Sequence, residues 1–171
     1  MELFEAILSR RSVRRYTGRP VPEELVEQLL RAAHSAPSAN RGMPWEFVVV
    51  RRRETLDKLR AVCRNWGALE TAGLCIVVAA RLTGYPSSHL DFYMQDCGAC
   101  TENLLLAAQG LGLGAVWLGC CPVEERMKAV GELLNLPEGV VAFALVPVGY
   151  PAEEPARERA ERPIPVHLER Y

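Results

Sequence analysis

Long apolar runs are absent from the 171-residue chain, and none approaches the ~18 residues that a helix needs to span a bilayer. The order of features in a secretory signal peptide is also absent, because the first basic cluster follows the apolar stretch instead of preceding it. Neither sign of charge dominates, since 20 lysines and arginines face 21 aspartates and glutamates. This balance argues against a coat for nucleic acid or for an anionic membrane. We therefore expect a cytoplasmic protein whose partners include no nucleic acid and no membrane.

Familiar signatures of catalytic sites are missing too. The histidines are scattered without an H-E-x-x-H pattern, and no Ser-His-Asp or Cys-His arrangement is evident. Gly110, Gly112 and Gly114 follow a helical pattern and precede a strand pattern, which is the reverse of a Rossmann turn. We interpret these glycines as a helix cap and a tight turn. The sequence thus predicts no catalytic side chain that works without a cofactor.

The cysteines allow more than one interpretation. One pair forms a C-x-x-C motif and another pair is adjacent in the sequence, so a redox pair or a four-cysteine metal site is an alternative. Adjacent cysteines rarely both bind one tetrahedral zinc ion in good geometry, and a reducing compartment keeps thiols free. We therefore predict no metal and interpret all six as free, mainly buried thiols: Cys63, Cys75, Cys97, Cys100, Cys120 and Cys121.

Helical and strand patterns alternate along residues 1–171, which read as one domain with an extended basic, proline-rich tail at 151–171. Apolar periodicity and proline positions predict helices over about Glu2–Ser9, Pro22–Ala36, Glu54–Arg64, Leu90–Leu111 and Pro122–Leu134. Apolar runs predict strands over Trp45–Val50, Leu74–Ala80, 115–119 and Val140–Val148, and alternation of Ile164, Val166 and Leu168 is compatible with one more. The helix at 90–111 is apolar on nearly every side, so we expect it to be central and buried.

The roles of the polar residues at the start of that long helix, and of the three tryptophans, stay open. Asp91, Gln95 and Asp96 suit a helix N-terminus by charge, and Gln95 suits a bond across a subunit interface equally well. Trp45 and Trp117 fit a core or an interface, and for Trp66 we favour the core over partial exposure.

A cluster of arginines is the first positive chemical signal. Five arginines and no acid lie between Ser9 and Arg19, just after the first helical pattern. The planar guanidinium group matches phosphate oxygens in a bidentate way, and Ser12 adds a hydroxyl donor. A solvated basic turn is the alternative, and a nucleic-acid arm is a third, weakened because no other basic patch with interleaved aromatics exists.

Four segments together resemble the nitroreductase-like flavoproteins. They are R-R-S-V-R-R-Y at 10–16, A-P-S-A-N-R-G-M-P-W at 36–45, the Q-D…G-L-G-L-G-A-V-W-L-G stretch at 95–119, and L-V-P-V-G-Y-P at 145–151 followed by R-P at 162–163. The resemblance covers nearly the whole chain in the family's order. It implies an α+β fold with a central, mainly antiparallel sheet flanked by helices, and a homodimer with FMN at its interface.

The resemblance also implies an activity. A hydride would pass from NADH or NADPH to FMN, and an acceptor such as a nitroaromatic or a quinone would then use the same pocket in a ping-pong scheme. The protein would supply binding and electrostatics, with Arg14 or a nearby amide beside the pyrimidine edge of the flavin. The implied cofactor contacts are Arg10, Arg11, Ser12 and Arg14 from the arginine cluster, Pro37, Ser38 and Asn40 from the loop, Asn65, Leu118, Gly119, and Arg159 and Arg162 from the tail.

The chain departs from the family pattern in places. Met43 stands where the family usually has glutamine, and the region between Leu82 and Asp91 is short, so we expect an open site with a poorly specified acceptor. Three alternatives remain: a specialised relative such as a dehalogenase or a flavin-modifying enzyme, a phosphate- or nucleic-acid-binding module that uses the arginines at 10–19, and a thiol or metal protein.

Overall fold

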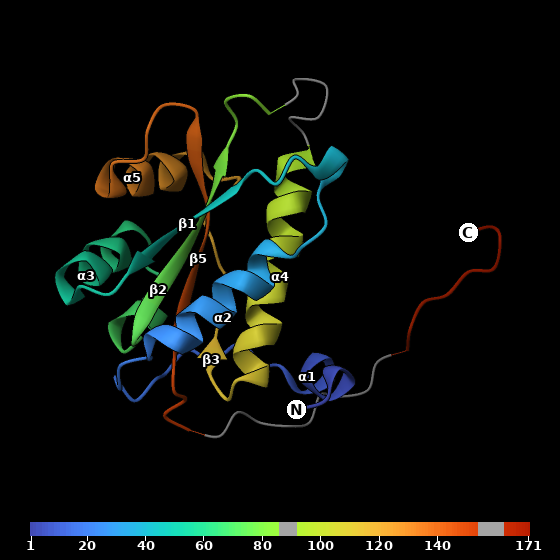
Figure 1. Cartoon of the computed structure of the whole chain (residues 1–171), viewed down its shortest axis with the longest axis horizontal. Coiled ribbons are helices and arrows are strands. Elements are labelled where there is room, and N and C mark those ends of the chain that lie inside the picture. Colours follow the sequence, from blue (N-terminus) through green and yellow to red (C-terminus); the bar gives the residue numbers. More distant parts are fainter. Residues whose placement is uncertain (86–91, 154–162) are drawn as a thin grey trace.

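The computed structural model describes residues 1–85, 92–153 and 163–171 (Figure 1). Its α-helices are α1 (Leu3–Ser9), α2 (Glu23–His34), α3 (Arg53–Val62), α4 (Tyr93–Gly110) and α5 (Glu124–Leu134), with short 3-10 turns η1 (Ala39–Arg41) and η2 (Gly67–Glu70). The strands are β1 (Trp45–Val50), β2 (Leu74–Arg81), β3 (Gly114–Ala115), β4 (Leu118–Gly119) and β5 (Val140–Gly149). Apolar periodicity therefore located the five α-helices and the strands β1, β2 and β5 to within a few residues.

The strands form one antiparallel sheet. Its order is β1-β2-β5-β3, and β4 also pairs with β5. The long partners β2 and β5 lie at its centre, where a register shift between Val78 and Ala79 interrupts an otherwise regular ladder. Helices cover both faces, so the predicted α+β class is confirmed.

Alternation along the central strand divides the core between the two faces of the sheet. Ile76 and Val78 pack with residues of α2 and α4 in one cluster, whereas Cys75 and Val77 pack with residues of α3 and η2 in the other. Successive side chains of a strand point to opposite faces, which is why one apolar run serves two cores. Helix α4 crosses the first of these faces, and its central part is buried against the sheet as expected.

The glycines after α4 form the predicted cap. Gly112 has φ +72, and the amides of Gly112 and Leu113 bind the carbonyls of Gln109 and Ala108 at 3.1 and 2.8 Å. These two hydrogen bonds give partners to carbonyls that a helix end otherwise leaves without them. Gly114 is needed for a different reason, because a Cβ there would lie 2.7 Å from the Cβ of Val13.

The predicted strand at 115–119 differs from expectation, because the structure divides it into β3 and β4. Both pieces keep one register against β5, with Ala115 opposite Val148 and Leu118 opposite Leu145. That register sets Pro147 opposite the interruption. Proline has no N–H to donate to a ladder, so pairing stops there and resumes beyond it.

The end of the chain also differs. Residues 163–171 form no strand, and Ile164, Val166 and Leu168 are each more than two-thirds exposed. Alternation alone cannot make a strand without a neighbouring edge to pair with. The predicted turn at 84–88 and the predicted helix start at Leu90 lie partly outside the described residues. Among the helices that the structure describes, none is long and apolar enough to cross a bilayer.

Candidate functional site

The arginine-rich segment at 10–16 is fastened to the sheet by its main chain. Ser12 makes a parallel bridge with Ala115, and the amide of Val13 donates to the Ala115 carbonyl at 3.0 Å. Val13 and Tyr16 are buried, whereas Ser12 and Arg14 are exposed. The segment therefore presents its polar side chains outward from a fixed backbone.

Tyr16 anchors the end of this segment. Its hydroxyl hydrogen is shared between the carbonyls of Val13 and Pro147, with oxygen–oxygen distances of 2.6 and 3.1 Å. The Tyr16 amide donates to Thr71 Oγ1 at 3.1 Å. Burial raises the pKa of Tyr16 well above its ordinary value, so the hydroxyl keeps its proton and remains a donor. The carbonyl of Pro147, a residue that cannot donate to the sheet, thus gains a side-chain partner.

The arginines of the segment differ in their local partners. The side chain of Arg10 lies 3.4 Å from Glu102 on α4. Arg11 donates to the carbonyls of Leu8 and Arg10, which lie at the end of α1, and Arg14 donates to the Ser12 carbonyl at 3.3 Å. These contacts hold several guanidinium groups close to one stretch of backbone.

Strand β4, the start of η2 and the arginine segment all contribute to one core cluster. Val13, Trp66 and Leu118 belong to it, and Ser12, Asn65 and Gly119 are their exposed neighbours in the sequence. Trp66 is 2% exposed, as the core interpretation predicted, while Asn65 beside it is exposed.

Arg126 of α5 joins two parts of this region and was not predicted. Its guanidinium group donates to the Gly119 carbonyl at 2.9 Å and lies 6.0 Å from the centre of the Trp66 ring. The sequence signal was weak, because Arg126 stands alone in an ordinary amphipathic helix. Only the fold shows that it faces the glycine.

The loop at 37–43 lies at the other end of α4 (Figure 1). The Ala39 amide donates a hydrogen bond to Asp96 in the first turn of α4. Ser9 accepts a hydrogen bond from Gln109 in the last turn. At 1.5 Å per residue, these two positions on the helix are about 20 Å apart. Within one chain the structure therefore separates Pro37, Ser38 and Asn40 from the arginine segment.

Two other predicted contacts cannot be placed. Arg159 and Arg162 lie outside the described residues. The structure pairs Ser12 with Ala115, three residues before Leu118 and Gly119, and Arg126 links Gly119 to Trp66, the neighbour of Asn65. The loop residues lie at the other end of α4.

The sequence patterns also gave no sign that Asp96 and Tyr85 contact the loop. Asp96 was interpreted only through its place at a helix start, yet it is 6% exposed and binds both Ala39 and Tyr85. Burial, followed by the hydrogen bond to Asp96, raises the pKa of Tyr85 to about 12. No local pattern links these residues, because the contacts join separate segments of the chain.

The cysteines are free thiols, and four of them are buried. Burial raises the pKa of Cys100 and of Cys120 to about 12, and it raises that of Cys97 further. Because the thiolate is the reactive form, these groups are poor nucleophiles at neutral pH. Cys121 is half-buried, and its sulfur lies 3.4 Å from the Tyr93 hydroxyl. Within residues 1–85, 92–153 and 163–171, no group of three or more potential ligands is arranged to hold a metal ion.

The chain matches known proteins over nearly its whole length. A family model described as the nitroreductase family matches residues 7–68 and 60–150. An Archaeoglobus fulgidus protein, provisionally named an NADH dehydrogenase/NAD(P)H nitroreductase, is 45% identical over 99% of this chain and 99% of its own.

Solved structures give the same result. A Clostridium acetobutylicum protein, provisionally named an NADH oxidase, is 42% identical with a TM-score of 0.90, covering 97% of this chain and 99% of its own. A protein from a Desulfovibrio desulfuricans subspecies, provisionally named a nitroreductase and solved in complex with FMN, is 32% identical with a TM-score of 0.78. That alignment covers 96% of this chain and 99% of the other.

Proposed function

The chain belongs to the nitroreductase family, and from this premise we propose that it is an FMN-dependent NAD(P)H oxidoreductase that works as a homodimer. The observation that carries the proposal is the arginine segment, which pairs with Ala115 and so lies beside β3, just before β4 in the chain. A basic segment on a fixed backbone and a glycine-containing strand meet there in one region.

The residues at this place suit the phosphate end of FMN. Arg10, Arg11 and Arg14 supply planar cationic donors, and Ser12 supplies a hydroxyl. Because Val13 and Tyr16 fix the backbone, these side chains meet a phosphate without ordering the main chain first. A solved relative with the same fold is in complex with FMN, which supports FMN as the phosphate-bearing ligand.

The ring end of FMN is assigned to backbone and amide groups. Gly119 is exposed and has no side chain, so a planar ring can approach its main chain closely. Leu118 precedes it in β4, and Asn65 precedes Trp66, which shares a core cluster with Leu118. Arg126 donates to the Gly119 carbonyl and thereby fixes the strand that the ring would contact.

When bound, FMN supplies the chemistry, which is hydride uptake from a reduced nicotinamide and delivery to an acceptor. The protein residues bind the cofactor and set the local electrostatics. Arg14 would lie beside the bound cofactor, where its positive charge would favour negative charge on it. This role needs no acid, base or nucleophile from the chain.

A second copy completes the site in this proposal. The loop at 37–43 lies about 20 Å from the arginine end of α4, so two α4 helices running antiparallel about a twofold axis would bring one copy's loop to the other's arginines.

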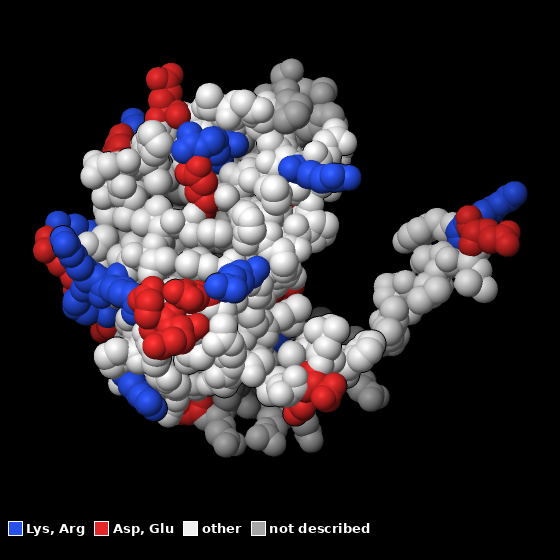
Figure 2. Space-filling view, in the orientation of Figure 1, with Lys and Arg blue, Asp and Glu red and all other residues white. Residues whose placement is uncertain are grey.

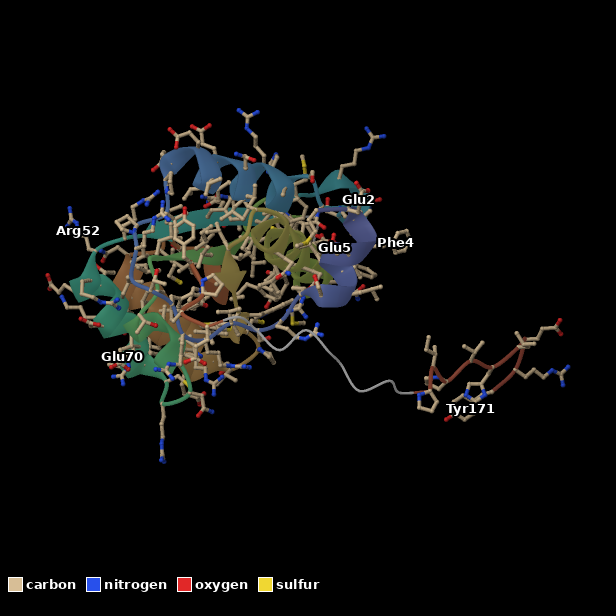
Figure 3. All side chains as sticks on the ribbon, turned by 90° about the horizontal axis from the view of Figure 1, so that it is seen from below. Glu2, Phe4, Glu5, Arg52, Glu70 and Tyr171 are labelled. Carbon is tan, nitrogen blue, oxygen red and sulfur yellow. The ribbon has the colours of Figure 1, made fainter. Side chains whose placement is uncertain are left out.

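Exposed apolar side chains support the same assembly. Leu3, Phe4 and Leu8 of α1 are each at least 65% exposed, and Figure 3 shows Phe4 pointing away from the body of the chain. The apolar residues of 163–171 are exposed as well, and Figure 3 shows this segment, with Tyr171, away from the body of the chain. Apolar groups gathered in this way mark surfaces that another chain covers.

Planar, conjugated acceptors such as nitroaromatics and quinones fit the surroundings of the α4 start. Four large apolar side chains are between 37% and 47% exposed there and in the neighbouring strand region: Met43, Phe92, Met94 and Trp117. The outermost atom of the Trp117 ring would lie 3.6 Å from a Cβ at Gly98, so this ring lies against α4. Flat apolar surfaces of this kind bind aromatic molecules of varied outline.

The cytoplasm is the compartment that suits the thiols. All six cysteines are free, and a reducing compartment keeps them so. On the face shown in Figure 2, basic and acidic side chains lie beside one another. The ion pairs Arg51–Glu23 and Lys58–Glu54 each measure 2.6 Å. A surface of mixed charge is suited to a freely diffusing enzyme of small substrates.

The test is the visible spectrum of the purified chain after reconstitution with FMN. Flavin bands that bleach on anaerobic addition of NADH or NADPH, and return when a quinone or a nitroaromatic compound is added, are the expected result. A colourless protein that does not retain FMN would contradict the proposal, and salt-dependent binding to nucleic acid would then favour the alternative module. Sedimentation at several concentrations checks the dimer.

A further inference from the structure

The loop at 37–43 has an unfavourable backbone. Asn40, Arg41 and Met43 have φ values of 48°, 57° and 37°, which lie in the left-handed region that residues with a side chain seldom adopt. Such conformations cost of order ~1–3 kcal/mol each and persist only when the surroundings determine them. Something outside the loop must therefore hold its shape.

The carboxylate of Asp96 is the central support. One oxygen accepts the amide hydrogen of Ala39 at 2.9 Å, and the other accepts the hydroxyl hydrogen of Tyr85 at 2.5 Å. The residue is 6% exposed and stands on α4, whose next residue Cys97 is fully buried. A carboxylate thus reaches from a rigid helix into the loop.

Tyr85 closes the other side of the loop. A Cβ at Gly42 would lie within 3.1 Å of two ring carbons of Tyr85, so the bare glycine backbone lies directly against the ring. Within the loop, the Met43 amide donates to Ser38 Oγ at 3.0 Å. The strained stretch is therefore held between the Asp96 carboxylate and the Tyr85 ring.

We propose that Asp96 and Tyr85 are positioning residues, which hold the loop so that Pro37, Ser38 and Asn40 reach the FMN site of a second copy. This inference rests on the proposed function. A favourable charge at a helix start explains an acid in this turn, but it does not explain a buried carboxylate whose two oxygens both bind groups outside the helix. Hydrogen bonds to an ionised group are short and strong, which suits a support for a strained backbone.

The test compares Tyr85→Phe and Asp96→Asn with Thr101→Val. Tyr85→Phe keeps the ring against Gly42 and removes only the hydroxyl, so it isolates the bond even if Asp96→Asn folds poorly. Thr101 is a matched control, because it is fully buried on the same helix and its hydroxyl donates to the Cys97 carbonyl at 2.7 Å, away from the loop.

Two measurements are needed. The first is the dissociation constant of FMN from the holoenzyme, which we expect to rise about tenfold in Tyr85→Phe and at least as much in Asp96→Asn. The second is amide hydrogen exchange in the flavin-free protein, where the Ala39 amide should exchange about tenfold faster in both variants. Thr101→Val should lower the melting temperature and leave both quantities within about twofold.

Three outcomes would overturn the inference while leaving the proposed function intact. Unchanged exchange at Ala39 in both variants would show that the loop does not depend on these bonds. Faster exchange with unchanged FMN affinity would show that the loop is held but does not serve the flavin. Equal weakening of FMN binding in Thr101→Val would show a general effect of lost stability. Failure of the wild-type chain to bind FMN would instead overturn the proposed function and this inference with it, which separates the two.

Discussion

The arginine segment and the loop lie at opposite ends of α4 and are held in opposite ways. The segment is fixed mainly by its backbone, through the pairing of Ser12 and Val13 with Ala115. The loop is fixed by side chains from elsewhere, chiefly Asp96 and Tyr85. Backbone hydrogen bonds persist through most changes of side chain, whereas hydrogen bonds to a single carboxylate are lost when that residue is replaced. The two halves of the proposed site should therefore respond differently to substitution.

The largest effect is expected at the arginine end, where side chains act on the ligand directly. Arg14→Gln should raise the dissociation constant of FMN about thirtyfold, because a charged donor to phosphate is worth about 2 kcal/mol. Arg15→Gln is the control, since Arg15 is exposed, points to Glu153 at 3.1 Å and is not among the proposed contacts. Flavin fluorescence titration measures both, and equal losses would show that only total charge matters.

Removing the anchor of the segment should cost stability. Tyr16→Phe removes the buried hydroxyl whose hydrogen is shared by the Val13 and Pro147 carbonyls, and leaves both carbonyls without that donor. We expect the free energy of unfolding in urea to fall by about 2 kcal/mol. Tyr85→Phe should cost less in the same experiment, since it frees a loop and leaves the sheet intact. A larger loss for Tyr85→Phe would reverse the comparison.

Two glycines separate steric from conformational effects. Gly42→Ala should weaken FMN binding several-fold, about 1 kcal/mol, because its Cβ would displace the Tyr85 ring and thus the loop. Gly18→Ala, just after the arginine segment, meets no atom within 4 Å but has φ +74. It should lower stability by about 1 kcal/mol and leave FMN affinity unchanged. Calorimetry and flavin titration together distinguish the two results.

The smallest effect is expected from the ionisation of Tyr85 at high pH. The pKa of Tyr85 is raised from 10.0 to about 12, so the stabilisation from its protonated hydroxyl is complete below pH 10 and disappears as the pH approaches about 12. The difference in phenolate absorbance between the wild type and Tyr85→Phe isolates this group. Its midpoint should lie near pH 12, and Asp96→Asn should lower it. A midpoint near pH 10 would show that the buried contact is absent in solution.

Local patterns located the helices and strands because apolar periodicity depends only on neighbours along the chain. Strand β1 has the predicted bounds, Trp45–Val50, and the glycines after α4 form the predicted cap. The division of 115–119 was not predicted, since it depends on Pro147 in a strand more than twenty residues away. Periodicity carries no information about such a partner.

The site was predictable as a set of residue types and not as an arrangement. The resemblance to the family named both the arginine segment and the loop, but nothing in the sequence showed that α4 separates them. Asp96, Tyr85 and Arg126 could not be found in advance, because their importance comes from contacts between distant segments.

Helix α4 has a consequence for how this chain can change in length. One end of the helix is bound to the loop through Asp96 and the other to Ser9 through Gln109, so the helix sets both the spacing and the angle between the two halves of the site. Deleting one residue between those positions would shorten the spacing by about 1.5 Å and rotate one end against the other by about 100°. A rotation of that size would turn Asp96 away from Ala39. Insertions and deletions are therefore far better tolerated in the turns and the tail than anywhere along this helix.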